Sequence, residues 1–287
     1  EQAIGNPFEN GPIELCCVIA YNALACDILG LTGDPKIADH LERSLYNAVM
    51  GSFSPTGRWS TYNTPMEGKK EANYHTIVFQ SRSGSPDLNC CSANAARGIG
   101  TAYAWALTRE GDTLFVNLYE SLHAVTSDGL EIDISGDYPA DPRVKIRLSS
   151  KNTRKIALRV PSWSENTRIS LYGAEPRPEA GSYYRFDKAP GETELDILFD
   201  FTPRFLKGDL DCAGQESVFV GPVLYGCDLA QNESMPDSLS RSELLVSLPD
   251  RSPDGGIVLK LGGGAVLRDF YHLGAGGSVY KTWFRII

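Results

Sequence analysis

The first third of the chain places its apolar residues three and four positions apart, which is the spacing of helices with one buried face. Capping residues mark the start of two of these segments, with Asp34 before Pro35 in one and Ser92 in the other. We therefore predict three helices, over residues 13–29, 34–50 and 92–109.

A long irregular segment, residues 52–89, separates the second predicted helix from the third. It is rich in glycine and proline and carries a cluster of aromatic residues with one histidine: Trp59, Tyr62, Tyr74 and His75. Long segments of this kind are more often functional than linking. The aromatic rings could stack on sugars or fill a core with about equal probability, and His75 has a modest claim to a site.

The pattern changes after Gly111, where apolar and polar residues alternate with a period of two and turn residues lie between the runs. Strands are predicted over 113–119, 144–148, 155–160 and 195–201, and no helix is predicted after residue 112. The chain is thus an α+β multidomain protein with domains 1–112 and 113–287 and a weaker boundary near 206–215. Three helices are too few for a complete helical domain, so they pack on the β half or belong to something longer.

Composition narrows the class of protein. The 287 residues are 42% hydrophobic and carry a net charge of −9, so a nucleic-acid partner is not expected. We expect no membrane span, because Tyr21, Asn22 and Asp27 interrupt the longest apolar segment, and the N-terminus has no features of a signal peptide. The compartment stays open, and we expect a soluble protein in the cytoplasm or periplasm of a bacterium.

Cysteine and glutamate supply the candidate chemistry. Glu14 and Cys16 at one place, with the adjacent Cys90 and Cys91 at another, offer the O and S ligands that suit a four-coordinate Zn²⁺. The later pair precedes a predicted helix, whose dipole favours thiolates, and a thiolate is also a nucleophile.

Simpler explanations stay open for the cysteines. Cys16, Cys17 and Cys26 share one predicted helix and could be small buried apolar residues. A redox-active dithiol is a weaker alternative, because vicinal cysteines bridge poorly. Among the carboxylates of the helical third, Glu1, Glu9 and Glu42 are more often solvated surface charges than catalytic groups, whereas Glu14 lies directly against the cysteines.

A series of short motifs resembles glycoside hydrolase family 127, the β-L-arabinofuranosidases and their relatives. The order is Glu14-Leu15-Cys16, then Leu-Glu-Arg-Ser-Leu-Tyr-Asn at 41–47, then Tyr-Asn-Thr-Pro at 62–65, then Cys-Cys-Ser-Ala-Asn at 90–94. Segments of the β half, 158–163 and 221–225, resemble the family's sandwich segments. The resemblance spans most of the chain.

The resemblance implies an (α/α)₆ barrel, of which residues 1–112 would be the C-terminal helices, followed by β-sandwich domains. It implies zinc held by Glu14, Cys16, Cys90 and Cys91, with Cys90 as the nucleophile. Glu1 is the nearest match to the family's acid/base, although the segment between it and Glu14 is shorter than in the arabinofuranosidases.

The substrate implied by the resemblance is a β-L-arabinofuranoside or a related plant or bacterial sugar, and Glu42, Tyr62 and His75 are candidates for binding it. Leu15 stands where many members have Thr, which leaves the sugar open. The alternative is a non-catalytic carbohydrate-binding or structural zinc protein. Expected partners are an oligosaccharide or glycoside and, as a homodimer, a second copy of the chain.

Overall fold

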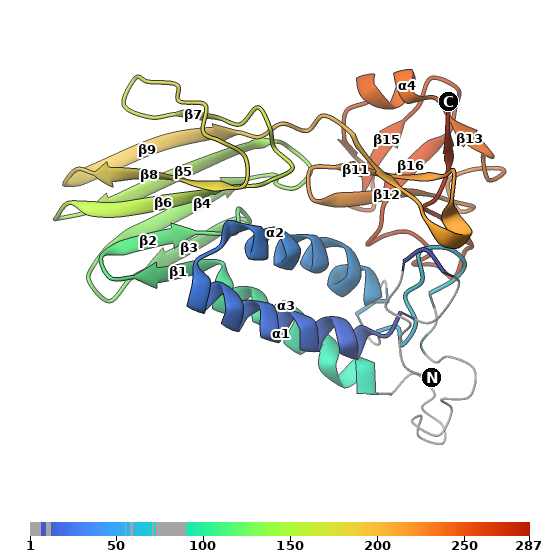
Figure 1. Ribbon diagram of the computed structural model, residues 1–287, viewed down its shortest axis with the longest axis horizontal. Helices are drawn as coiled ribbons and strands as arrows, with labels where there is room; N and C mark the ends of the chain where they lie inside the picture. The colour runs from blue at the N-terminus through green and yellow to red at the C-terminus, as the bar shows by residue number, and fades with distance from the viewer. Residues whose placement is uncertain (1–6, 10–12, 55, 58–59, 71, 73–89) are drawn as a thin grey trace. The chain divides into compact units, whose positions relative to one another are not determined.

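The computed structural model describes residues 7–9, 13–54, 56–57, 60–70, 72 and 90–287 (Figure 1). The chain forms two compact units, each built from separate segments. The first unit comprises Glu1–Ala23, Arg43–Gly100 and Thr202–Ile287, and the second comprises Leu24–Glu42 and Thr101–Phe201. The sequence prediction divides the chain near residue 112, with a weaker boundary near 206–215, whereas each of these units combines segments that are distant in sequence.

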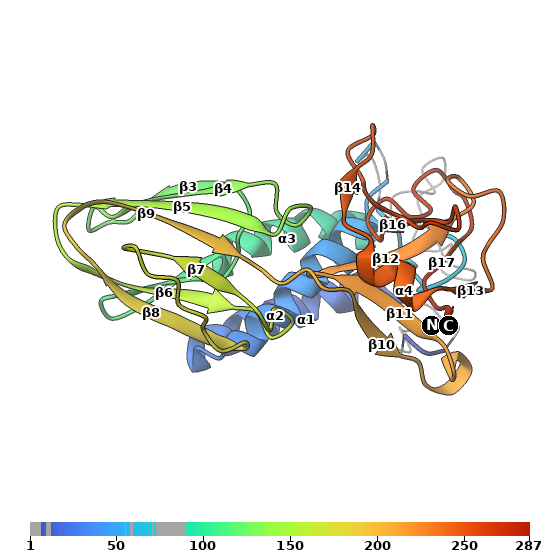
Figure 2. The ribbon, with the colours of Figure 1, turned by 90° about the horizontal axis from the view of Figure 1, so that it is seen from above.

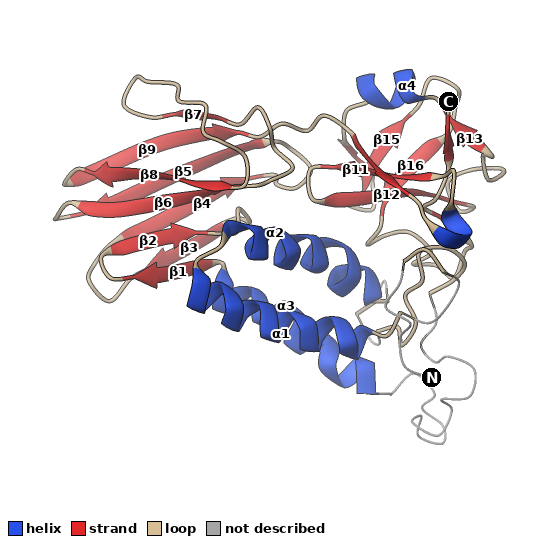
Figure 3. Ribbon diagram, in the orientation of Figure 1, coloured by secondary structure: helices blue, strands red, loops and turns tan. Residues whose placement is uncertain are grey.

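The helices confirm most of the predicted pattern (Figure 3). The early elements are α1 (Leu15–Thr32), α2 (Pro35–Arg43), the π-helical η1 (Ser44–Val49), the 3-10 turn η2 (Met50–Ser52) and α3 (Cys90–Trp105). The third helix ends earlier than predicted, because β1 (Leu107–Glu110) pairs with β2 (Thr113–Val116) across Gly111, which has a positive φ of 54°. Local pairing across this tight turn therefore replaces the last turn of the predicted helix.

The prediction of no helix after residue 112 is wrong. Two short helical elements follow it, η4 (Leu210–Cys212) and α4 (Arg241–Val246). Ser240 is the N-cap of α4, and its side chain accepts a hydrogen bond from the backbone N–H of Glu243. Ser-x-x-Glu is a sequence signature of a helix start, so this helix was readable from the sequence.

The second unit contains a β-sandwich. One sheet has the order β1-β2-β6-β8 and the other β3-β4-β5-β9-β7, and Figure 2 shows β3, β4 and β5 in one layer and β6 and β8 in the other. The predicted period of two is confirmed in β5, where Val144, Ile146 and Leu148 are buried between exposed neighbours. Its further strands are β3 (Leu122–Val125), β4 (Glu131–Gly136), β5 (Arg143–Ser150), β6 (Arg154–Val160), β7 (Arg168–Ser170), β8 (Ser182–Lys188) and β9 (Gly191–Leu198).

The first unit contains the remaining strands. Its larger sheet has the order β10-β11-β12-β16-β15-β14, with β17 paired to β12, and β13 pairs separately with β18. The central strand β12 is buried along its whole length. The bounds are β10 (Arg204–Lys207), β11 (Glu216–Val220), β12 (Val223–Asp228), β13 (Ser238–Leu239), β14 (Asp250–Arg251), β15 (Ile257–Lys260), β16 (Val266–Asp269), β17 (Tyr280–Lys281) and β18 (Arg285–Ile286).

Helix α1 is long and apolar enough to cross a membrane by length and composition alone, with a mean hydropathy of 1.8. By length and composition, this helix contradicts the expectation that no apolar segment is long enough to span a membrane. Core helices of soluble proteins can have the same length and apolar composition. Leu15, Ile19, Ala25 and Leu29 give the helix a buried face at helical spacing.

A buried charge cluster joins α2 to the sandwich in the second unit. The Arg159 guanidinium lies 2.6 Å from Glu42, both side chains are fully buried, and Arg159 also pairs with Asp39. The Glu42 carboxylate accepts two further hydrogen bonds, from the Tyr138 hydroxyl at 2.6 Å and from the Trp163 indole N–H at 3.1 Å. A buried ion pair needs this many partners, because neither charge can reach water.

In the first unit, residues of β17 and of the segments that follow β16 and β17 hold the segment at 60–70. Hydroxyls of Tyr280 and Thr282 donate to the carbonyls of Pro65 and Met66, and Lys70 Nζ donates to the carbonyls of Phe270 at 2.6 Å and Tyr271 at 3.1 Å. This anchoring fixes the stretch that carries Tyr62. Burial lowers the pKa of Lys70 to about 7, and the neighbouring carboxylates of Asp269 and Asp228 offset part of that effect.

We expect Arg159→Met to lower the free energy of unfolding by about 3–5 kcal/mol, because it leaves the buried Glu42 carboxylate and the partly buried Asp39 carboxylate without their cation. The matched control is Arg147→Met, since Arg147 pairs with Asp133 at 3.0 Å with its side chain 49% exposed. Urea unfolding should show the control nearly unchanged. Equal effects at the two positions would contradict a structural role for the buried pair.

Lys70→Met should remove a rise in stability at alkaline pH. Between about pH 7 and the pKa of about 10.4 of an unfolded lysine, the unfolded chain binds more protons than the folded one. The free energy of unfolding therefore increases with pH across this window, by up to about 1.4 kcal/mol per pH unit. In urea unfolding at pH 7, 8 and 9, the stability of the wild type relative to Lys70→Met should rise with pH. Its stability relative to the control Lys260→Met should stay constant, because the Lys260 side chain is 68% exposed. Parallel pH profiles for the wild type and Lys70→Met would contradict the prediction.

Candidate metal centre

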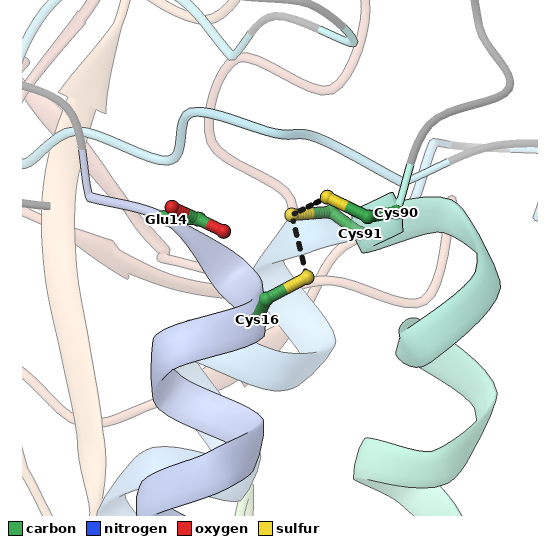
Figure 4. A group of neighbouring side chains, drawn as sticks. All are labelled: Glu14, Cys16, Cys90 and Cys91. Atoms are coloured by element: carbon green, nitrogen blue, oxygen red, sulfur yellow. Dashed lines mark hydrogen bonds between the residues drawn. The ribbon is translucent and has the colours of Figure 1, made fainter. Parts of the chain in front are cut away.

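The N-terminal ends of α1 and α3 meet in the first unit (Figure 4). They pack closely because α3 carries Gly98 at the contact, where a Cβ would lie 2.8 Å from a methyl of Val49 and 3.3 Å from Ile19. Cys16 is the second residue of α1, and Cys90 and Cys91 are the first two of α3. The convergence of two helix starts therefore brings three thiols to one place.

Glu14 joins the thiols through a short pairing that precedes α1. It forms an antiparallel bridge with Asn63, and the Leu15 N–H donates to the Tyr62 carbonyl at 3.3 Å. The Asn63 side chain also accepts a hydrogen bond from the Ile13 N–H at 3.0 Å. This pairing places the Tyr62 hydroxyl 2.8 Å from Glu14 Oε2, to which it donates.

One carboxylate oxygen and three sulfur atoms lie within 4.8 Å of one another in this group: Glu14, Cys16, Cys90 and Cys91. The sulfur of Cys91 lies 3.2 Å from that of Cys16 and 4.0 Å from that of Cys90. These separations bracket the value of about 3.8 Å expected for two sulfurs bound tetrahedrally at 2.3 Å from one ion. The residues therefore fit a metal ion.

The protonation of the thiols depends on whether a cation is bound. Burial raises the pKa of Cys90, and the neighbouring Cys16 thiol and Glu14 carboxylate raise it further. Burial and a hydrogen bond to Cys16 also raise the pKa of Cys91, whose side chain is fully buried. Without a cation the two thiols thus keep their protons at neutral pH, and a bound cation would favour the thiolates that serve as ligands.

An apolar shell surrounds the group. Leu15, Ile19, Tyr62, Cys91 and Ala95 form a buried cluster, against which Phe53 and the partly exposed Cys16 and Cys90 pack. Burial also raises the pKa of the Tyr62 phenol, with a further contribution from its hydrogen bond to Glu14. Tyr62 therefore acts here as a hydrogen-bond donor that orients the carboxylate.

Three other residues were expected at the site: Glu1, Glu42 and His75. Glu42 belongs to the second unit, where Arg159, Tyr138 and Trp163 occupy its carboxylate. A substrate-binding role for Glu42 stays a prediction. Glu1 and His75 lie outside the described residues.

Asn94 was missed as a contributor to the centre. It lies one turn after Cys90 in α3, and its side-chain amide contacts the sulfur of Cys16 at 3.3 Å. Its place in the Cys-Cys-Ser-Ala-Asn segment was the one available signal, because helical spacing puts residue 94 on the same face as residue 90.

A second group, on the sandwich, has metal-ligating side chains: His123, Glu131 and Asp133. Its members are largely exposed, and Asp133 already pairs with His123 at 2.7 Å and with Arg147 at 3.0 Å. These ion pairs account for the group as part of a solvated sheet surface.

Two family models match the chain and together cover more than half of it. Residues 2–103 match the β-L-arabinofuranosidase GH127 catalytic domain, and residues 113–194 match the GH127 middle domain. A curated relative is the non-reducing end β-L-arabinofuranosidase of Bifidobacterium longum subsp. longum, 24% identical over 236 residues, which are 76% of this chain and 36% of the relative.

Solved structures agree in fold. A GH127 β-L-arabinofuranosidase from Geobacillus stearothermophilus T6 superposes with a TM-score of 0.80 at 20% identity, covering 98% of this chain and 51% of that one. Another GH127 β-arabinofuranosidase has a TM-score of 0.77 at 21% identity, covering 96% and 50%. The chain thus spans about a third of the curated relative and about half of these structures. The resemblance noted in the sequence is confirmed: the chain belongs to glycoside hydrolase family 127.

Proposed function

We propose that the chain is part of a retaining glycoside hydrolase that acts on β-L-arabinofuranosides or a related plant or bacterial sugar. The observation that carries this proposal is the group of Glu14, Cys16, Cys90 and Cys91, gathered at two helix N-termini inside the segment that matches the GH127 catalytic domain. The names of the relatives supply the substrate class. We further propose that α1, α2 and α3 belong to an (α/α)₆ barrel.

The proposed metal is zinc, held by Glu14, Cys16, Cys90 and Cys91. Three thiolates and one carboxylate form a donor set that zinc accepts in tetrahedral geometry. Bound zinc would hold the thiols as thiolates near neutral pH. Tyr62 would orient the Glu14 carboxylate from outside the ligand set, as its 2.8 Å hydrogen bond supports.

Cys90 is the proposed nucleophile, and differences in burial support it over Cys91. The Cys91 side chain is fully buried and cannot reach a sugar, whereas Cys90 is partly exposed at the first position of α3. In the first step the Cys90 sulfur attacks the anomeric carbon, a C–S bond forms, and the glycosidic C–O bond breaks. Glu1, the proposed acid, protonates the leaving oxygen.

The second step releases the sugar. Glu1, now a carboxylate, takes a proton from water, the water oxygen attacks the anomeric carbon, and the C–S bond breaks to return the sulfur as thiolate. Two displacements at one carbon retain its configuration. The alternative, a structural zinc protein that binds carbohydrate without catalysis, is less favoured, because the relatives are named as glycosidases.

Metal analysis tests the proposed centre. The purified protein should contain about one zinc per chain, and removal by a chelator should lower the urea unfolding midpoint, because metal binding contributes free energy to the folded state. Cys16→Ser should reduce the zinc content. Cys26→Ser is the matched control, since Cys26 lies on the same helix outside the group, and it should retain the metal. Equal zinc loss in both variants, or no zinc in the wild type, would contradict the assignment.

Replacement of the nucleophile tests the chemistry. Cys90→Ser should lower kcat/KM for a chromogenic β-L-arabinofuranoside by a factor on the order of 10³ or more, since loss of a covalent nucleophile can cost about 10⁶ in rate. Cys17→Ser, an exposed neighbour of Cys16, should leave the rate and the unfolding midpoint nearly unchanged.

A thiol-reactive sugar analogue separates catalysis from a structural role. Mass spectrometry should locate the label on Cys90. A Cys90→Ser variant that keeps its turnover would refute the nucleophile. A zinc-loaded wild type that neither turns over substrate nor reacts with the analogue would support the structural alternative.

A further inference from the structure

The side-chain amide of Asn94 connects the two helices that carry the cysteines. Its Nδ2 lies 3.3 Å from the sulfur of Cys16 on α1 and 3.1 Å from the backbone carbonyl of Cys90 on its own helix. Asn94 therefore contacts both a proposed zinc ligand and the residue of the proposed nucleophile. It is a polar, uncharged group beside a cluster of acidic ones.

The Cys90 carbonyl fixes the orientation of this amide. A carbonyl oxygen only accepts hydrogen bonds, so the amide nitrogen, not the amide oxygen, must face it. The same nitrogen then faces Cys16, and one N–H is directed to each partner. An amide has two N–H donors, and these two contacts use both. The amide thus donates to the sulfur of Cys16 and to the carbonyl, not the sulfur, of Cys90.

We propose that Asn94 is a positioning residue that makes Cys16 a spectator ligand and so leaves nucleophilic attack to Cys90. This inference rests on the proposed zinc centre. A hydrogen bond to a thiolate stabilises its negative charge, which lowers its nucleophilicity and holds its side chain in one direction. Asn94 therefore distinguishes two thiols that both start a helix and are both partly exposed.

Tyr62 contacts the carboxylate of Glu14 in the same way that Asn94 contacts the sulfur of Cys16. Its hydroxyl donates to Glu14, just as Asn94 donates to Cys16, so the two ligands near the start of α1 each receive a donor from another segment. Groups of this outer shell change metal affinity by about 10–100-fold when they are removed. The start of α1 is thereby held as the fixed half of the centre.

Cobalt replacement in the full protein tests the role of Asn94. Asn94→Leu keeps the approximate shape but removes both donors, and the thiolate-to-cobalt absorption band should move to lower energy because the sulfur lone pairs lose a stabilising contact. Zinc affinity, measured by chelator competition, should fall by about 10–100-fold. Asn94→Asp, nearly the same shape and also without donors, serves if the leucine variant does not fold.

The matched control is Ser92→Ala, on the same turn of α3. Ser92 exchanges hydrogen bonds with the backbone of Ser60 at 3.3 and 3.4 Å, so its loss perturbs the helix start while the Asn94 amide keeps its contact with Cys16. The control should leave the absorption band in place. A shift of equal size in the control would assign the effect to the helix start and overturn the role of Asn94.

Alkylation of the zinc-loaded protein gives a readout that a purely structural role would not move. In the wild type, iodoacetamide should modify Cys90 faster than Cys16, and in Asn94→Leu the ratio of Cys16 to Cys90 modification should rise several-fold. The role of Asn94 is refuted, and the metal centre is not, by the following result. The wild type shows the thiolate-to-cobalt band, whereas Asn94→Leu shifts neither the band nor the ratio of Cys16 to Cys90 modification. A wild-type protein without any thiolate-to-cobalt band refutes the metal centre, and the role of Asn94 with it.

Discussion

The convergence of two helix N-termini is the constraint on which the centre depends. Each helix start presents unpaired N–H groups and a partial positive charge, which favours anions nearby. The structure places three thiols and one carboxylate there, and burial raises the pKa of Cys90 and Cys91. Two weak dipoles do not offset that burial. A bound cation would resolve the conflict, because it would stabilise several thiolates at once.

The convergence in turn depends on chain far from the helices. Glu14 is held by its bridge to Asn63. The segment that carries Asn63 and Tyr62 is fixed by hydrogen bonds that Tyr280, Thr282 and Lys70 donate. These contacts join residues about 200 positions apart within the same unit. Residues 270–282 therefore support the centre through the segment at 60–70, within the same compact unit.

Local pattern was enough to predict much of the fold and the ligand group, and long-range contacts mark where it fails. The helices at 13–29 and 34–50 followed from periodicity and caps. The third predicted helix overlaps β1, because the chain forms a hairpin at Gly111 although the helical spacing of apolar residues continues. Glu42 shows the same limit. Its partners Tyr138, Arg159 and Trp163 lie 96 to 121 positions away, and no local pattern places them together.

The three cysteines of the centre have identical side chains but different surroundings. Cys91 is completely buried, and the Asn94 amide donates to Cys16. Cys90 remains partly exposed at the first position of α3, with its carbonyl rather than its sulfur facing that amide. A metal alone would treat three thiolates alike. The proposed single nucleophile requires an inequality among them, which burial of Cys91 and the amide of Asn94 would supply.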